Sequence, residues 1–219
     1  MSGFTDHVAR GVLNHITGKS ALFSMPTAYV GLFTAVGTDA GTGFTEVSGG
    51  SYARVTTGAS DWNAASGTGP SSISNAATLT FPTTSAPWGT IIAFGLFDDP
   101  SAGDLLAWDY VGNFAWRPAT ISLASPGVLT IPAHGYSVAD QVIFSTEYGG
   151  AAPSFSQSNL TGILVVAHAA TDTFDVTNGG TQVNTSSTGS GLVRKVATQT
   201  IGSGVLPSFG AGSFVIVAG

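Results

Sequence analysis

The chain has 219 residues, and its 12 acidic and 6 basic residues give a formal net charge of −6. Six cations cannot form a basic stripe, which excludes a typical nucleic-acid binder. Charged residues make up 8% of the sequence, where soluble domains carry about 25%, so the surface is largely neutral and suits packing against other copies or another protein. The absence of cysteine excludes disulfides, thiolate nucleophiles and cysteine-based zinc sites.

The N-terminal segment lacks a basic region followed by an apolar one, so we expect no secretory signal. The longest apolar runs, such as residues 91–97, are far shorter than the ~20 residues of a membrane span. We therefore expect a soluble protein made in a reducing cytoplasm, without membrane insertion.

One amphipathic helix is predicted at the start of the chain. Val8, Val12, Leu13 and Ile16 recur at helical spacing, between a cap at Thr5 or Asp6 and a terminating Gly18. A single apolar stripe indicates that this helix docks on something. The stripe predicts two alternative partners, the domain's own sheet or a neighbouring subunit.

Short β-branched and aromatic runs, divided by turn residues, follow Pro26 and predict an all-β sandwich or jelly-roll-like domain. The predicted strands span residues 28–34, 52–57, 77–81, 90–97 and 105–110. Residues 90–97 are apolar throughout, which is typical of a central strand covered on both faces.

A set of motifs follows in order along the first half of the chain. These are residues 27–35 (TAYVGLFTA), 46–54 (EVSGGSYAR), 75–82 (NAATLTFP), 88–90 (WGT), 94–98 (FGLFD) and 105–108 (LLAW). The series resembles a family of small tailed-bacteriophage proteins described as tail-fibre proteins. In that family a stretch like residues 201–209 (IGSGVLPSF) comes soon after the last of these motifs, whereas here it is displaced.

The displacement predicts an insertion. We expect residues 1–121 plus 197–219 to form a β-sandwich attachment domain, and residues 122–196 to form an inserted small β-barrel module. The insert resembles the β module of phage structural proteins that is named after the FCCH domain of ubiquitin-activating enzymes, a likeness that implies no ubiquitin chemistry. The motifs that carry this resemblance are residues 128–136 (VLTIPAHGY), 140–144 (DQVIF) and 173–176 (TFDV), and the predicted strands span residues 128–131, 141–144, 162–167, 173–176 and 192–195.

Candidate chemistry is sparse. His134 follows a predicted strand, and we expect its ring to hydrogen-bond the backbone of the turn. Asp98, Asp99 and Asp104 could ligate calcium, but their spacing lacks the alternation of a calcium loop and favours a hairpin with solvated acids. Known catalytic motifs are absent from the sequence, so we expect no enzyme activity, no cofactor and no metal site.

Exposed aromatic rings could bind sugars, because the apolar face of a sugar stacks on a π surface. Trp62 and Tyr148 lie beside predicted loops and are the candidates for contact with a glycan or a partner. Most such rings serve as core or interface anchors, so a carbohydrate- or host-receptor-binding module is the alternative hypothesis. The resemblance to the phage family implies a non-enzymatic structural subunit of a tailed-phage virion, self-associating and attached to the tail or capsid as a fibre or decoration protein, with the insert displayed outward.

Overall fold

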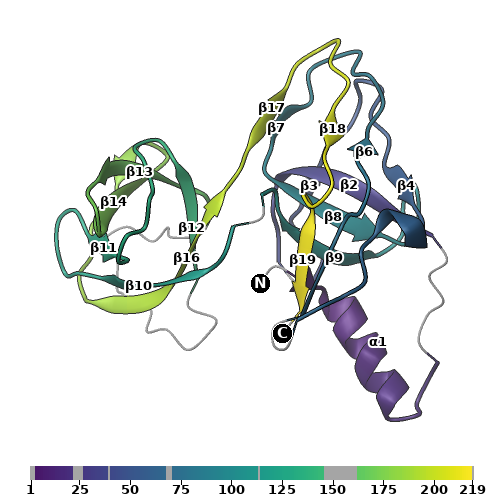
Figure 1. Cartoon of the computed structure of the whole chain (residues 1–219), viewed down its shortest axis with the longest axis horizontal. Coiled ribbons are helices and arrows are strands. Elements are labelled where there is room, and N and C mark those ends of the chain that lie inside the picture. Colours follow the sequence, from purple (N-terminus) through teal and green to yellow (C-terminus); the bar gives the residue numbers. More distant parts are fainter. Residues whose placement is uncertain are drawn as a thin grey trace. The chain divides into compact units, whose positions relative to one another are not determined.

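The computed structural model describes residues 3–21, 27–38, 40–67, 71–112, 114–145 and 162–218. The chain divides into two compact units (Figure 1). Unit 1 combines Met1–Asn113 with Thr198–Gly219, and unit 2 is Phe114–Ala197. The mainly β prediction is confirmed, with 43% of the described residues in strands and 7% in helix.

The main sheet of unit 1 is antiparallel and has six strands. Its order is β1 (Gly3–Phe4), β9 (Leu105–Tyr110), β8 (Ala93–Phe97), β2 (Ala28–Ala35) and β3 (Thr45–Glu46), and β4 (Val55–Thr57) also pairs with β2. Gly31 of β2 lies opposite Gly95 of β8. A Cβ atom at Gly95 would lie 2.5 Å from Leu105 Cδ1 and 2.7 Å from the Phe33 ring, so both sequence motifs carry glycine where aromatic rings crowd the backbone.

The C-terminal segment of unit 1 pairs in turn with three earlier strands. These ladders join β17 (Gln199–Ile201) to β7 (Gly89–Ile91), β18 (Ser208–Phe209) to β6 (Leu79–Thr80), and β19 (Val215–Ala218) to β5 (Ser71–Ser74). A 3-10 turn, η1 (Ala59–Asp61), precedes β5. Chain segments far apart in sequence therefore form one unit.

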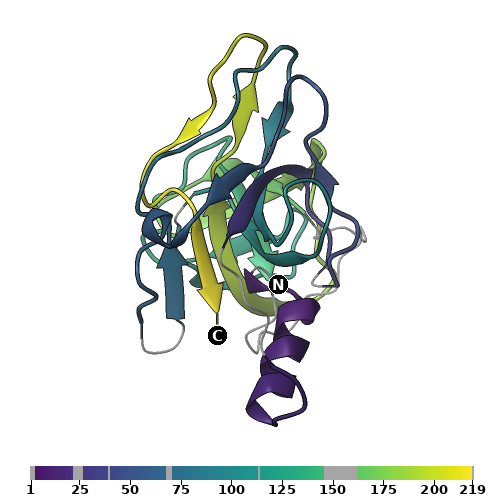
Figure 2. The same ribbon diagram turned by 90° about the vertical axis from the view of Figure 1, so that its right-hand side faces the viewer.

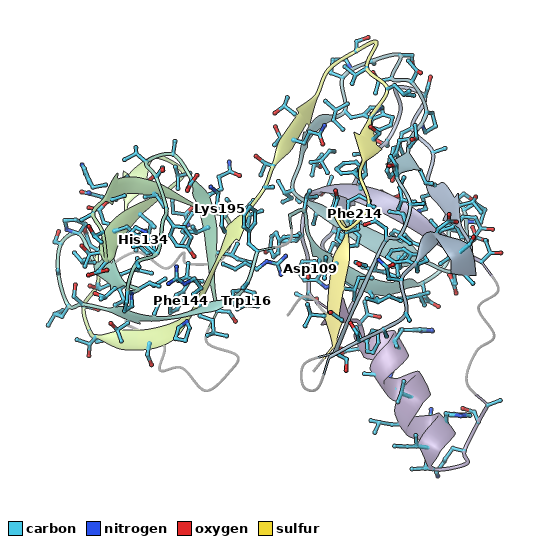
Figure 3. The ribbon with its side chains drawn as sticks, viewed as in Figure 1. Asp109, Trp116, His134, Phe144, Lys195 and Phe214 are labelled. Carbon is cyan, nitrogen blue, oxygen red and sulfur yellow. The ribbon has the colours of Figure 1, made fainter. Side chains whose placement is uncertain are left out.

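Aromatic side chains fasten this C-terminal segment to the main sheet. Phe214 is fully buried and stacks on Phe94 of β8, with ring centroids 4.3 Å apart (Figure 3). Phe209 lies 4.6 Å from Phe214 and 5.9 Å from Phe81, again between ring centroids. The core of unit 1 is thus shared between its two sequence segments.

A buried amide adds polar contacts to this packing. Asn75 is 0% exposed, and its side chain donates to the carbonyl oxygens of Ala77 and Gly210 and accepts the Phe214 N–H. A buried amide is stable only when its polar atoms find partners. Two of these three partners come from the C-terminal segment.

Several predicted strands are confirmed but differ in length. The predicted strand 90–97 is interrupted at Ile92, so that β7 pairs with β17 while β8 pairs with β2 and β9. The predicted strands 52–57 and 77–81 shorten to β4 and β6. These shorter strands border turns at Gly49–Tyr52 and around Asn75, where side chains and loop carbonyls take the backbone hydrogen bonds instead.

Unit 2 is a closed six-stranded barrel. Its strands run in the order β11 (Val128–Thr130), β10 (Arg117–Ile121), β16 (Gly189–Val196), β12 (Gln141–Ser145), β13 (Leu164–Ala169) and β14 (Thr173–Asn178), and β14 pairs back with β11. The short β15 (Thr181–Gln182) extends β14. Apolar side chains that include Leu129, Leu164 and Phe174 fill the barrel. Closure removes the open edges that a sheet of this size would otherwise expose.

The first strand of the barrel begins before the expected start of the insert. Sequence analysis placed the boundary between residues 121 and 122, whereas β10 pairs with β11 and β16 within unit 2. Arg117 of β10 donates to the carbonyl oxygens of Pro132 and Ala133 in the same unit. Pro118 and the adjacent small residues of β10 give no strong strand pattern in the sequence.

His134 makes the predicted hydrogen bond with the backbone of its turn. Its ring is 5% exposed, and Nδ1 accepts the Tyr136 N–H at 2.9 Å (Figure 3). Because Nδ1 is an acceptor, the proton resides on Nε2, which lies 3.3 Å from the Thr173 carbonyl oxygen. The ring also packs against Tyr136 and Phe174.

We predict that Phe214→Ala destabilises unit 1 by about 3–5 kcal/mol, because it leaves a cavity between Phe94 and Phe209. Leu206→Ala is the matched control, since Leu206 lies in the same segment but is 58% exposed, and it should change stability by less than about 0.5 kcal/mol. Chemical denaturation followed by tryptophan fluorescence measures both. A loss below about 1 kcal/mol for Phe214→Ala would contradict the shared core.

We also predict that unit 1 folds without unit 2. Replacing residues 114–197 with a short Gly/Ser linker removes a unit that has a hydrophobic core of its own. The shortened chain should unfold in one cooperative transition and give a dispersed NMR spectrum. Aggregation, or the spectrum of an unfolded chain, would mean that unit 1 needs the barrel.

Candidate docking surface on the N-terminal helix

The N-terminal helix, α1 (Asp6–Ile16), is anchored at its first turn. Gly3 and Phe4 pair with Trp108 and Ala107 of β9. Thr5, which is 1% exposed, donates its hydroxyl to the Leu105 carbonyl oxygen at 2.6 Å, and its N–H bonds the Leu106 carbonyl at 2.9 Å. Thr5 is the N-cap residue, but its hydroxyl binds β9 instead of capping the helix.

Beyond its first turn, α1 leaves the surface of unit 1 (Figures 1 and 2). Val8 is the only buried residue of the helix among those described. The remaining residues of the predicted stripe are increasingly exposed along the helix, with Val12 at 38%, Leu13 at 59% and Ile16 at 70%. The sheet of unit 1 therefore covers Val8 and leaves the other three uncovered. We call Val12, Leu13 and Ile16 the α1 stripe.

The sequence of α1 does not favour a free-standing helix. Isolated helices shorter than about 12–15 residues are marginal in water, and α1 has 11 residues. Gly11 in its interior costs about 1 kcal/mol relative to alanine, and the valines and isoleucine lose side-chain freedom in a helix. Burial of the α1 stripe would supply the missing stabilisation, at roughly 1.5–3 kcal/mol for each side chain fully buried.

The far end of α1 is closed by local contacts. The Thr17 hydroxyl donates to the Leu13 carbonyl oxygen at 2.7 Å. Gly18, at φ +70°, donates its N–H to the carbonyl oxygen of His15. A glycine at positive φ is the common helix terminator, as the sequence predicted. The helix thus has a defined end that is set by its own residues.

Charged side chains occur within α1 itself, which contains Asp6 and Arg10. Asp6 occupies the first turn, where a carboxylate complements the positive end of the helix dipole. His7 Nδ1 lies 3.5 Å from Asp104 Oδ2, and both side chains are well exposed. The α1 stripe itself contains no charged residue, so an apolar protein surface is its natural complement.

The acidic loop around Asp99 is organised by its own backbone. Asp99 Oδ1 accepts the N–H groups of Ser101 and Ala102, and Asp98 Oδ1 accepts that of Asp104. The N–H groups of Ser101 and Ala102 hold the pKa of Asp99 below its usual range. This arrangement is an Asx-type turn. Among the described residues, no group of three or more His, Asp or Glu side chains is arranged to hold a metal ion.

Polar residues of the sequence motifs meet in a structural cluster. Arg54 donates to both oxygens of Glu46 and to the carbonyl oxygens of Asp99 and Ala102, so it ties the acidic loop to the sheet. Its guanidinium carbon lies 3.3 Å from the centre of the Phe97 ring, a close cation–π contact. Tyr52 donates to Glu46, and burial, followed by the charge of Glu46, raises the pKa of Tyr52. Glu46, Tyr52 and Arg54 therefore stabilise unit 1 by joining its sheet to the acidic loop.

The structure describes Trp62 but not Tyr148, the two residues predicted to contact a glycan or a partner. Trp62 is half-buried, and its indole N–H donates to the Thr57 hydroxyl at 3.1 Å. This contact anchors the ring beside β4, and whether sugar stacks on it stays a prediction. Tyr148 lies outside the described residues. The sequence predicts Thr5 only as a candidate helix cap, because its anchoring of α1 depends on pairing with β9 about 100 residues away.

Helices long and apolar enough to cross a membrane do not occur in the described part of the chain.

Comparison of the sequence with known protein families finds a match for the first half of the chain. Residues 3–113 match the model of the family described as podophage GP4 fiber I protein gp80. The match covers just over half of the chain and ends where unit 2 begins. It confirms the resemblance to phage fibre proteins, while the FCCH-like resemblance of the insert lies outside the match and stays a prediction. No curated protein matches the chain.

We predict that α1 frays in the dilute chain. Amide protons of residues 12–17 should exchange at rates within roughly tenfold of an unstructured peptide, because little tertiary packing holds them. Amides of β8, at the centre of the sheet, are the internal reference and should exchange slowly. Hydrogen exchange with mass spectrometry measures both segments in one sample. Strong protection at Leu13 would show that α1 needs no partner.

Proposed function

Since the chain belongs to the family of the podophage GP4 fiber I protein gp80, we propose that it is a non-enzymatic fibre subunit of a tailed-phage virion that attaches through α1. The observation that carries the proposal is the α1 stripe, anchored at one end and uncovered along the remainder of the helix. A helix of this length and composition gains stability when another protein surface covers it.

The polar chemistry of unit 1 agrees with a structural role. Glu46, Arg54 and Asn75 are engaged in hydrogen bonds that connect chain segments. Low charge and a surface of small residues favour contact with other copies and with further virion proteins on the tail or capsid. Weak contacts of this kind become strong in a particle through copy number.

Unit 2 is the displayed part in this proposal. It has its own closed sheet and core, and it lies outside the residues that match the fibre family. An independently folded insert can change a particle's outer surface without changing its attachment, because insertion into a surface connection leaves the host domain's core intact. The attachment and display roles therefore fall on different units.

We predict that Leu13→Asp removes the chain from purified particles, with incorporation falling at least about tenfold, because a carboxylate in an apolar interface costs more than 1.4 kcal/mol. Leu13 is 59% exposed, so the variant should keep the thermal midpoint of the unchanged chain. Quantitative mass spectrometry of particles assembled with tagged chains measures incorporation.

Val138→Asp is the matched control for that experiment. Val138 is 62% exposed and belongs to unit 2, so the same charge is added to a residue that is not part of α1 or of unit 1. This variant should enter particles normally. Normal incorporation of Leu13→Asp would refute attachment through α1, and equal loss for both variants would indicate a general effect of added charge.

A further inference from the structure

Unit 1 is assembled from two parts of the chain that are separated by the whole of unit 2. We call Met1–Asn113 its first segment, and Thr198–Gly219 is the C-terminal segment. Strands β5, β6 and β7 of the first segment each have a strand of the C-terminal segment as their ladder partner. All three pairs join residues that are more than 100 positions apart in the sequence. Unit 1 is therefore completed only by residues that follow unit 2.

The core of unit 1 is incomplete without the C-terminal segment. The buried Phe214 ring stacks on Phe94, and the Phe214 N–H donates to the side-chain oxygen of Asn75 at 2.9 Å. A Cβ atom at Gly3 would lie 2.5 Å from the Val217 carbonyl oxygen, so β19 also packs closely against β1, the strand that precedes α1. Folding of unit 1 thus requires its two segments to meet.

Unit 2, in contrast, is one continuous stretch of chain whose first and last strands are joined by hydrogen bonds. Its first strand, β10, pairs with its last strand, β16, from Arg117 opposite Val193 to Ile121 opposite Gly189. Paired Cα atoms in an antiparallel ladder lie about 4.5–5.5 Å apart. The closed barrel also has a core of its own, in which Leu164 is fully buried. Once the barrel has formed, residues 117 and 193 are neighbours.

The pairing of β10 with β16 shortens the loop that must close before unit 1 can fold. In the unfolded chain, Phe114–Ala197 separates the two segments, a loop of roughly 80 residues. In the folded barrel only residues 114–116 and 194–197 lie beyond the pair of Arg117 and Val193, which reduces the effective loop to about ten residues. The probability that the ends of a flexible loop meet falls roughly as the 3/2 power of its length. A folded barrel therefore makes this encounter roughly 20-fold more frequent.

We infer that unit 2 folds first and serves as a clasp, which brings the C-terminal segment back to the first segment so that unit 1 can close. Contacts within unit 2 join residues of one continuous stretch, whereas unit 1 needs contacts across that stretch. Contacts between residues far apart in the sequence form slowly, because the entropy of loop closure must be overcome first. This role of unit 2 goes beyond its display on a particle and is independent of what α1 binds.

The order of folding is measured on the full-length chain by pulses of hydrogen exchange during refolding, followed by mass spectrometry. The chain contains 10 prolines, so the unfolding step is kept brief enough for them to retain their native isomers. Amides of β12 and β14 in unit 2 should become protected first. Amides of β8, in the first segment, and of β19, in the C-terminal segment, should follow together at one rate. Protection of β8 before β12 and β14, or well before β19, would overturn the inference.

Two double variants of the full-length chain test whether the barrel speeds the closure of unit 1. Leu129 and Leu164 are 1% and 0% exposed in the barrel core, so Leu129→Asp with Leu164→Asp places two carboxylates there and prevents the barrel from folding. Leu123→Asp with Val138→Asp is the matched control, because these residues of unit 2 are 60% and 62% exposed. Protection of β8 should develop roughly 20-fold more slowly in the core variant and at the unchanged rate in the control. Equal rates in the two variants would contradict the clasp.

The chain in which a short Gly/Ser linker replaces residues 114–197 separates loop closure from other effects of the barrel. This chain has a short loop and no barrel, so its β8 amides should become protected at least as fast as those of the unchanged chain, even where the core variant folds slowly or not at all. Slow or failed folding of the linker chain would show that unit 1 needs the barrel itself, and it would overturn the inference. None of these measurements involves particles, so their outcome is separate from that of the proposed function.

Discussion

The fold depends on the packing of the C-terminal segment against the first half of the chain. Phe209 and Phe214 complete an aromatic core with Phe81 and Phe94, and Asn75 receives two of its side-chain contacts from residues 210 and 214. Neither segment could bury these groups alone. Because the core closes through residues at both ends of the sequence, a separate barrel can occupy the chain between them.

Two exposed apolar surfaces lie at opposite ends of unit 1 (Figure 1), and each is held by hydrogen bonds between distant parts of the chain. At one end, Thr5 anchors α1 to β9 and leaves the α1 stripe uncovered. At the other end, Thr84 fixes the loop between β17 and β18, which exposes Val205 and Leu206. Both threonines are buried, and both use the side-chain hydroxyl to bind the backbone of a segment about 100 residues away or more. Both exposed apolar surfaces are therefore held in place by contacts between distant parts of the chain.

Local patterns predicted the elements whose side chains repeat regularly. The helix, its end at Gly18, and the strands β2 and β9 follow from periodicity and turn residues. Other features depend on distant partners and left no local signal. The break at Ile92 exists because β7 and β8 pair with different strands, and β10 carries Pro118 in a strand whose partners lie in the barrel.

The sequence predicted only part of the candidate docking surface, because the rest depends on tertiary contacts. Helical spacing identified all four apolar residues of α1, but only the packing against β9 separates Val8, which is buried, from the three residues of the α1 stripe. The loop between β17 and β18 belongs to one of the family motifs, yet its conformation depends on Thr84, more than 100 residues earlier in the sequence. Periodicity reports which residues share a face, and tertiary contacts decide which part of that face stays exposed.

Site-specific cross-linking tests the central claim, that α1 attaches this subunit to other proteins, most directly. A photoreactive phenylalanine analogue at position 13 keeps that position apolar, and the same analogue at position 138 serves as the reference. Illumination of assembled particles should couple position 13 to another protein chain with high yield and position 138 with low yield. Equal yields at the two positions, or no product from position 13, would contradict the account.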